Sequence, residues 1–239
     1  MANSFFRFKQ FIIHQDRCAM KVTTDGCLFG AMIASKPFKE KRAVLDIGGG
    51  TGLLSLMFAQ KHAGSFIDVI EIDAHAFEQA KENIGLSDWK VRVQVIHADV
   101  KEYKFSKKYD LIFSNPPFYE NEIKSTIHKK NIAHHGAGLV FEDLCRVIKK
   151  NLKSDGKFYL LLPFKREKYV EKALKENQLF MHEKIRVRQS TKHAYFRMII
   201  SGGHSGSVPE KASEISICNN QMQYTEEFIA LLKDYYLSL

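Results

Sequence analysis

The chain has 239 residues, 45% of them apolar and 26% charged, so it can form a full hydrophobic core and is not globally disordered. No apolar run reaches the ~18–20 residues that a membrane-spanning helix needs, and the first residues show no signal-peptide pattern. The net charge of +9, from 36 Lys and Arg against 27 Asp and Glu, suggests a polyanionic partner such as nucleic acid. A solvated basic surface would have the same composition.

Four cysteines are scattered along the chain, with no Cys-x-x-Cys pair and no cluster of His and Cys. They are Cys18, Cys27, Cys145 and Cys218. This usage indicates buried thiols in a reducing compartment and argues against a disulfide framework or a structural zinc. We therefore expect a cytoplasmic protein without a bound metal.

From residue 42 onward, short β-branched runs alternate with helical patterns, which is typical of βαβ units around a parallel sheet. The expected strands are 42–47, 66–72, 91–96, 109–114 and 158–162. The expected helices are 53–62, a segment around 77–84, 138–152 and a segment around 170–174. Two further strand-like runs, 183–188 and 195–200, predict an antiparallel pair at the sheet edge. The Gly/Ser-rich stretch 201–212 is expected to be a mobile loop, and 228–235 a final amphipathic helix.

These elements predict one α/β domain over residues 1–239, with a mostly parallel seven-stranded sheet and an antiparallel C-terminal edge pair. Residues 42–201 form its expected core. Residues 1–41 are expected to pack on this core as an N-terminal segment that caps its ligand site, and 202–239 to form a loop, a short strand and the C-terminal helix.

A glycine loop, Asp46-Ile47-Gly48-Gly49-Gly50-Thr51-Gly52, follows the first core strand and opens a helix. This is the strand-end crevice in which open α/β sheets bind nucleotides, and glycines let the backbone approach such a ligand. The loop fits neither the Gly-x-Gly-x-x-Gly dinucleotide pattern nor a Walker-type phosphate loop. A glycine-rich structural turn is the alternative.

Two acids follow later strands. Glu71 ends the second core strand, where a carboxylate can accept both ribose hydroxyls of an adenosine. The alternative role, capping the next helix, fits Asp73 better because it stands just before that helix. Asp99 follows the third core strand and is placed either to accept an adenine amino group or to form a plain turn.

Asn115-Pro116-Pro117-Phe118 directly follows the fourth core strand. Two prolines cannot continue a ladder, so the segment forms a rigid elbow rich in acceptors. An amide side chain and a backbone carbonyl there can accept both hydrogens of one planar amine, which positions it and stabilises developing positive charge. Phe118 offers a face on which an extruded base can stack. A proline turn with a buried Phe is the alternative.

The motif Asp46-x-Gly48-x-Gly50-x-Gly52 resembles motif I of class I S-adenosylmethionine-dependent methyltransferases, and Asn115–Phe118 resembles their amino-methyltransferase motif IV. Together with Phe8-Lys9-Gln10-Phe11, the segment from Met20 to Gly26 and the ending Tyr236-Leu237, the whole chain resembles the bacterial tRNA1(Val) adenine-N6-methyltransferase family. The resemblance implies a Rossmann-like fold and methyl transfer from S-adenosylmethionine to N6 of the adenine next to the anticodon. Phe118 departs from the tyrosine that is also common there, and guanine-N2 enzymes often carry Phe.

The resemblance also implies residue roles. Asn115 and Pro116 would hold the amine and Phe118 would stack the base. Lys21, Thr23, Thr24 and Asp25 would lie near the methionine end of the cofactor. The remaining expected cofactor-binding residues are Asp46, Gly48, Gly50, Gly52, Glu71, Ile72, Asp99, Val100 and Asn115 itself.

Basic residues near the expected site fit an RNA substrate, because they could neutralise phosphates. The candidates are Lys124, Lys129, Lys130, Arg186, Arg188, Lys192 and Arg197. The alternative is an exposed basic surface that binds nothing. The neighbouring pair His134-His135 has no carboxylate or Cys beside it, which favours a solvated loop over a metal site.

The leading hypothesis is therefore a tRNA adenine-N6-methyltransferase that binds S-adenosylmethionine and tRNA and acts as a monomer. A guanine-N2 methyltransferase acting on rRNA is the closest alternative. A non-catalytic RNA-binding module with a retained cofactor pocket is disfavoured by the intact set of Asp46, Glu71 and Asn115. Glutamine-modifying release-factor enzymes and DNA adenine methyltransferases usually carry an added recognition domain, for which the chain leaves no room.

Overall fold

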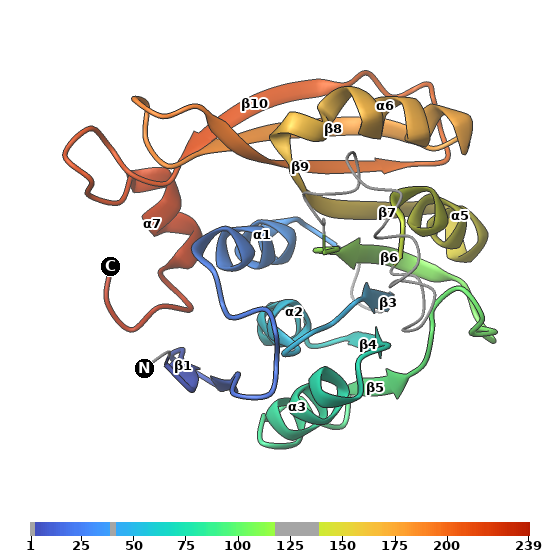
Figure 1. Ribbon diagram of the computed structural model, residues 1–239, viewed down its shortest axis with the longest axis horizontal. Coiled ribbons are helices and arrows are strands. Elements are labelled where there is room, and N and C mark those ends of the chain that lie inside the picture. Colours follow the sequence, from blue (N-terminus) through green and yellow to red (C-terminus); the bar gives the residue numbers. More distant parts are fainter. Residues whose placement is uncertain (1–2, 39–41, 118–138) are drawn as a thin grey trace, which may run out of the picture.

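The computed structural model describes residues 3–38, 42–117 and 139–239. One eight-stranded sheet crosses the described part of the molecule in the order β10-β8-β9-β7-β6-β3-β4-β5. Figure 1 shows this order from β10 at the top to β5 at the bottom. The central strands are almost fully buried, which is why they appear in the sequence as continuous apolar runs.

Five strands form the parallel part of the sheet: β3 (Arg42–Ile47), β4 (Ser65–Glu71), β5 (Val93–His97), β6 (Tyr109–Ser114) and β7 (Leu152–Pro163). Strand β9 (Tyr195–Gly203) runs antiparallel to both β7 and β8 (Phe180–Arg188). Strand β10 (Lys211–Ser216) then pairs parallel to β8 and forms the edge.

Helices cover both faces of the sheet. One core contains residues of α1 (Thr24–Ser35), α2 (Leu53–Lys61), α3 (Ala74–Gly85) and α7 (Glu226–Leu232). The other contains residues of α5 (Phe141–Asn151) and α6 (Glu167–Glu176), the latter preceded by the short 3₁₀ turn η1 (Phe164–Arg166). In Figure 1, α1 and α2 lie on the opposite side of the central strands from α5. This three-layer arrangement confirms the predicted α/β fold class.

The sheet differs from the prediction at its C-terminal edge. It has eight strands where seven were expected, and the antiparallel pair β8–β9 lies inside the edge because β10 covers it. The ends of the expected loop 201–212 belong to strands, since β9 continues to Gly203 and β10 begins at Lys211, whereas the stretch between them lies in neither strand. Position 202, in β9, requires glycine because a Cβ there would come within 2.1 Å of the carbonyl oxygen of Phe180. Its glycine reflects close strand packing rather than a loop.

The N-terminal segment contains two elements that the periodicity did not predict. A small hairpin pairs β1 (Phe5–Arg7) with β2 (Ile12–His14), and α1 follows. Every residue of α1 from Asp25 to Ala34 is buried, so the helix has no polar face and hence no amphipathic pattern.

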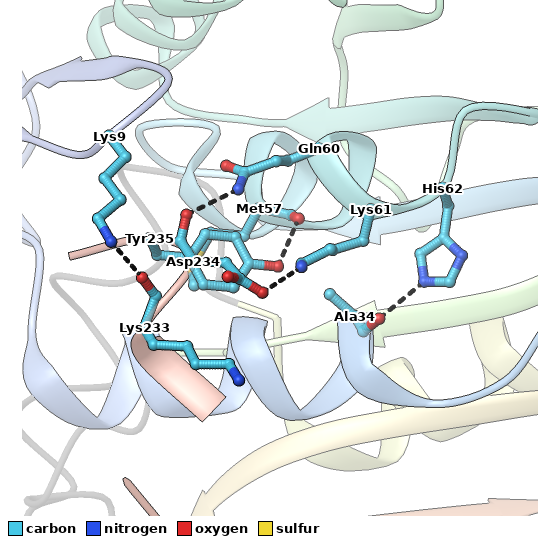
Figure 2. Close-up of polar contacts among 9 residues, drawn as sticks. All are labelled: Lys9, Ala34, Met57, Gln60, Lys61, His62, Lys233, Asp234 and Tyr235. Atoms are coloured by element: carbon cyan, nitrogen blue, oxygen red, sulfur yellow. Dashed lines mark hydrogen bonds and ion pairs between the residues drawn. The ribbon is translucent and has the colours of Figure 1, made fainter. Parts of the chain in front are cut away.

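Hydrogen bonds join the N-terminal and C-terminal segments to each other and to α2, as Figure 2 shows. We call this set of contacts among Lys9, Gln60, Lys61 and residues 233–235 the clasp. The Lys9 ammonium donates to the carbonyl of Lys233 at 2.6 Å, and the backbone N–H of Lys9 donates to the carbonyl of Tyr235 at 2.8 Å. From α2, Gln60 donates to the carbonyl of Asp234, and Lys61 forms an ion pair with the Asp234 carboxylate. The N-terminal segment is thereby fixed to the core that carries the glycine loop.

Candidate active site

The carboxyl ends of β3, β4, β5 and β6 meet at one edge of the sheet, where open α/β proteins bind their ligands. The glycine loop, Glu71, Asp99 and Asn115 follow these four strands in turn. The topology therefore brings together residues that lie far apart in the sequence.

The glycine loop owes its shape to positive φ angles: Gly48, Gly50 and Gly52 have φ of 71°, 56° and 81°. A Cβ at Gly48 or Gly50 would meet nothing within 4 Å, so the backbone at these positions borders open space. Gly49 is needed for a different reason, because its Cβ would come within 2.1 Å of Val69 Cγ1. The loop thus packs closely on β4 and presents bare backbone on its open side.

Asp46 is completely buried at the end of β3. Its Oδ2 accepts a hydrogen bond from Ser55 Oγ at 2.7 Å, whereas Oδ1 has no partner among the described residues. Burial raises the pKa of Asp46 to about 7, with a further contribution from Glu71, although the hydrogen bonds from Ser55 oppose the shift. A buried carboxylate oxygen without a donor marks a place where a cationic or hydrogen-bonding ligand group would be stabilised.

Glu71 is buried at the end of β4 and holds the glycine loop in place. Its Oε2 accepts from the N–H of Gly50 at 2.9 Å, and its Oε1 accepts from the N–H groups of Ile72 and Asp73. The expected cap of α3 is indeed Asp73, whose side chain accepts from the N–H of Ala76 at 2.8 Å. Glu71 is therefore not the helix cap and faces the loop.

Ile72 follows Glu71 in the chain, and Asp99 follows Ala98, whose backbone N–H donates to the carbonyl of Glu71 at 3.0 Å. Ile72 is 55% exposed although it is apolar, so it offers an uncovered surface next to the acid. Asp99 forms a turn, since its Oδ1 accepts from the N–H of Lys101 at 2.9 Å and its Oδ2 pairs with the Lys101 ammonium at 3.3 Å. Val100 packs into the hydrophobic core. Contact of Asp99 and Val100 with an adenine stays a prediction.

The Asn115 elbow begins where β6 ends. Ser114 Oγ donates to the carbonyl of Ile47 at 2.6 Å, which ties the start of the elbow to the end of β3. Asn115 is partly exposed, and its amide nitrogen lies 3.8 Å from the sulfur of Met20. Pro116 is buried, whereas Phe118 lies outside the described residues. The N-terminal segment therefore passes directly beside Asn115.

Buried amides attach the N-terminal segment to the site. Asn83, on α3, accepts from the N–H of His14 and donates to the carbonyls of His14 and Thr51. Gln15 accepts from the N–H of Val22, and its carbonyl accepts from the Lys21 ammonium. The sequence analysis did not predict either amide. The signal available for Asn83 was its position on the apolar face of the expected helix, next to Ala80 and Ile84.

The start of α1 holds the other expected cofactor residues. Thr23 caps the helix, with its Oγ1 accepting from the N–H of Gly26 at 3.2 Å, and Thr24 is exposed. Asp25 is buried, and its Oδ2 accepts from Arg197 Nε at 2.8 Å. Arg197, expected to bind RNA, thus contacts an expected cofactor residue.

The other basic candidates fall into three groups. Arg188 donates to Ser216 and pairs with Glu214, and Arg186 lies 3.9 Å from a carboxylate oxygen of Glu167. Lys192 is exposed in the turn between β8 and β9. Lys124, Lys129 and Lys130, together with His134 and His135, lie outside the described residues.

Comparison with known proteins defines the family. Residues 28–189 match the model of the methyltransferase small domain. A tRNA1(Val) (adenine(37)-N6)-methyltransferase from Christiangramia forsetii is 38% identical, with 100% of both chains covered. One of the same description from Dyadobacter fermentans is 47% identical over 72% of this chain and 70% of its own. The chain belongs to this methyltransferase family.

Solved structures show the same fold. A predicted O-methyltransferase from Agrobacterium tumefaciens superposes with a TM-score of 0.68 at 16% identity, covering 86% of this chain and 95% of its own. A putative RNA methyltransferase from Pyrococcus horikoshii gives 0.53 at 17% identity, covering 81% and 87%. These structures confirm the predicted class I methyltransferase fold, and membership of the family confirms S-adenosylmethionine as the cofactor.

The site fits this cofactor by its own geometry. The open backbone at Gly48 and Gly50 lets a ligand approach closely. The Asp46 oxygen that has no partner among the described residues suits a cationic group, and the exposed apolar side chain of Ile72 suits a flat ring. Within the described ranges no three His, Cys, Asp or Glu side chains gather in a way that could hold a metal ion. No helix in these ranges is long and apolar enough to cross a membrane.

Proposed function

We propose that this protein methylates N6 of an adenine in tRNA, specifically adenine 37 of tRNA1(Val). The proposal is carried by Asn115, which stands at the carboxyl end of β6 beside the glycine loop in a chain whose full-length relatives are described as methylating that adenine. The net charge of +9 agrees with a polyanionic substrate.

S-adenosylmethionine, when bound, supplies an electrophilic methyl group. Glu71, Ile72 and Asp99 would hold its adenosine, whereas Asp46 and residues 21–25 would face its amino-acid end. Their present contacts favour this division: Glu71 fixes the loop that borders the open space, and Asp46 keeps one buried oxygen without a donor.

Asn115 and the carbonyl of Pro116 would accept the two hydrogens of the adenine amine. This orients the amine nitrogen and stabilises the positive charge that develops there as it accepts the methyl group. Proline fixes φ, so the elbow presents its acceptors without a further ordering cost. Phe118 is proposed to stack the target base.

The decisive experiment compares wild type with Asn115→Ala, using labelled S-adenosylmethionine, unmodified tRNA and rRNA, and digestion of the products to nucleosides. Wild type should form N6-methyladenosine in tRNA. Loss of the acceptor should lower the turnover number about 10²–10³-fold while the affinities for cofactor and tRNA remain.

Asn177→Ala, at the end of α6, is the matched control and should keep full turnover. N2-methylguanosine in rRNA as the wild-type product would reassign the substrate. Cofactor binding without any methyl transfer would indicate a binding module. We further propose that the protein is cytoplasmic, acts as a monomer and needs no metal ion. Size-exclusion chromatography with light scattering would test the oligomeric state, and methylation assays with a chelator would test metal dependence.

A further inference from the structure

We propose that the turn end of the β8–β9 hairpin is a second RNA-contact site, where the Phe196 ring stacks on an unpaired base and Lys192 neutralises a neighbouring phosphate. The inference rests on the proposed function, because it assigns the part of the enzyme that would hold RNA outside the methylated nucleotide. Its ligand is single-stranded RNA.

The hairpin turn lies at the same edge of the sheet as Asn115. In the register, Ser114 at the end of β6 is level with Leu160 of β7, and β7 continues to Pro163, which is level with Arg197 of β9. At ~4.8 Å between strands and ~3.3 Å per residue, Phe196 lies roughly 15 Å from Ser114. A short stretch of single-stranded RNA can span this distance.

A β-bulge turns Phe196 out of the ladder. Val187 pairs with Arg197 and Arg188 pairs with Tyr195, so Phe196 is an extra residue without a partner on β8. Bulges of this kind re-aim side chains and are common beside active sites. The Phe196 side chain is 40% exposed, which leaves a large apolar surface in water at the rim of the site.

The neighbours of Phe196 are held by contacts of their own. The Tyr195 ring meets Phe164 edge-on at 5.2 Å, the Arg188 guanidinium lies 5.2 Å from the centre of the Tyr195 ring, and the Tyr195 hydroxyl bonds to Glu214. These contacts rigidify the strand end, so a base that stacks on Phe196 meets a preorganised surface.

The adjoining turn presents a cation. The N–H of His193 donates to the carbonyl of Ser190, and Ser190 Oγ lies 2.8 Å from His193 Nδ1. Lys192 stands between them, exposed, and its ammonium has no acidic partner in the part of the chain that the structure describes. Arg186 and Arg188 of the same hairpin face Glu167 and Glu214 instead. The turn end of the hairpin thus offers, four residues apart, an exposed aromatic ring and an ammonium without an acidic partner among the described residues, and proteins that bind single-stranded RNA combine stacking platforms with positive charge in this way.

The first test measures Phe196→Ala and Phe196→Trp binding to an unmodified tRNA1(Val) transcript and to a fluorescent single-stranded oligoribonucleotide. Phe196→Ala should weaken binding of both probes about 5- to 100-fold, because a stacked base is lost, whereas Phe196→Trp should retain it. Phe66→Ala is the matched control, since Phe66 is 57% exposed at the opposite end of the sheet. Cofactor affinity should stay unchanged in all three variants.

The second test separates stacking from charge. Lys192→Ala should reduce the slope of log affinity against log salt by about one phosphate contact, whereas Phe196→Ala should leave the slope as in wild type. Lys90→Ala, an exposed lysine at the amino end of the sheet, is the control and should change neither the slope nor the affinity.

Equal RNA affinity of Phe196→Ala and wild type would overturn the inference, even if wild type methylates tRNA. If wild type instead methylates no tRNA adenine, the proposed function fails, and the oligoribonucleotide measurements still decide whether the hairpin binds RNA.

Discussion

At the scale of single residues, the buried carboxylate of Asp46 links stability to pH. Its pKa of about 7 lies above the ~3.9 of an exposed Asp, since burial disfavours the ionised form. Between these pH values the folded protein keeps a proton that the unfolded chain has released. Asp46 therefore contributes a destabilisation that grows as the pH rises from about 4 to 7 and is complete above 7.

Asp46→Asn removes the charge and keeps the shape. Without cofactor, we expect the melting temperature of the Asn variant to exceed that of wild type at pH 8 by on the order of 10 °C, at ~1.4 kcal/mol per pKa unit and roughly 2–4 °C per kcal/mol. The difference should disappear near pH 4, and cofactor affinity should fall. Thermal unfolding of both proteins across this range checks the prediction. A difference that does not grow with pH would contradict it.

Arg197 gives the second prediction at this scale, because its sequence-based and structural roles differ. Its Nε bonds to Asp25, whose side chain is 11% exposed, so Arg197→Ala should leave that carboxylate without its partner. We expect stability to fall by about 1 kcal/mol and cofactor affinity several-fold, with the salt slope of tRNA binding unchanged. A slope reduced by one, with cofactor affinity intact, would instead establish a phosphate contact.

Local chemistry explains which site residues the sequence could place. Glu71, Asp73 and Asn115 follow buried apolar strands, so their positions at the carboxyl edge follow from strand order alone. The partner of Arg197 was not predictable in this way. Asp25 lies 172 residues earlier, and the pair forms only because β9 returns antiparallel beside β7.

At the scale of elements, the glycine loop is shaped by both backbone conformation and packing. Gly49→Ala places a methyl group against Val69 Cγ1, on a stiff β-branched side chain at the centre of a strand. We expect the variant to lose about 1–3 kcal/mol through overpacking. In Gly49→Ala/Val69→Ala the clash is removed, so the loss should be smaller than the sum of the single losses by about 1 kcal/mol or more.

Gly50→Ala serves as the control for this cycle. Its Cβ meets nothing within 4 Å, but its φ of 56° strains any side chain by about 1–2 kcal/mol. This loss arises from the backbone and should be additive with Val69→Ala. Denaturant unfolding of the five variants and wild type measures both cycles. If the losses of Gly49→Ala and Val69→Ala are additive in the double variant, the Val69 side chain shifts to accommodate the new methyl group without a loss of stability.

Complete burial and close packing explain why the sequence did not predict some elements. Helix α1 is buried from Asp25 to Ala34, so its composition carries no helical period, and its Thr23 cap is seen only in the structure. Gly202 and Gly203 suggested a loop, yet glycine there permits close approach of β8 and β7. Periodicity detects half-buried elements; it fails where burial is complete or where glycine serves packing.

At the scale of the whole molecule, the clasp in Figure 2 couples the C-terminal segment to the active site through the N-terminal segment. Tyr235 is central to it: its side chain is 1% exposed, its hydroxyl donates to the carbonyl of Met57 at 3.0 Å, and its carbonyl accepts from Lys9. The segment that begins at this clasp continues to Met20, beside Asn115. Loosening the clasp should therefore affect a site that Tyr235 does not touch.

Tyr235→Phe should cost about 1 kcal/mol, because one buried hydrogen bond is lost, and Tyr235→Ala about 3–5 kcal/mol. In Tyr235→Ala, at a temperature where the protein is still folded, we expect faster amide exchange in residues 4–22 and weaker cofactor binding. Leu237→Ala, at a side chain that is 58% exposed, should change neither. Hydrogen exchange followed by mass spectrometry distinguishes the two possibilities. A uniform increase across the whole chain would mean that Tyr235 supports only global stability, whereas an increase concentrated in the N-terminal segment would show that the clasp keeps this segment against the site.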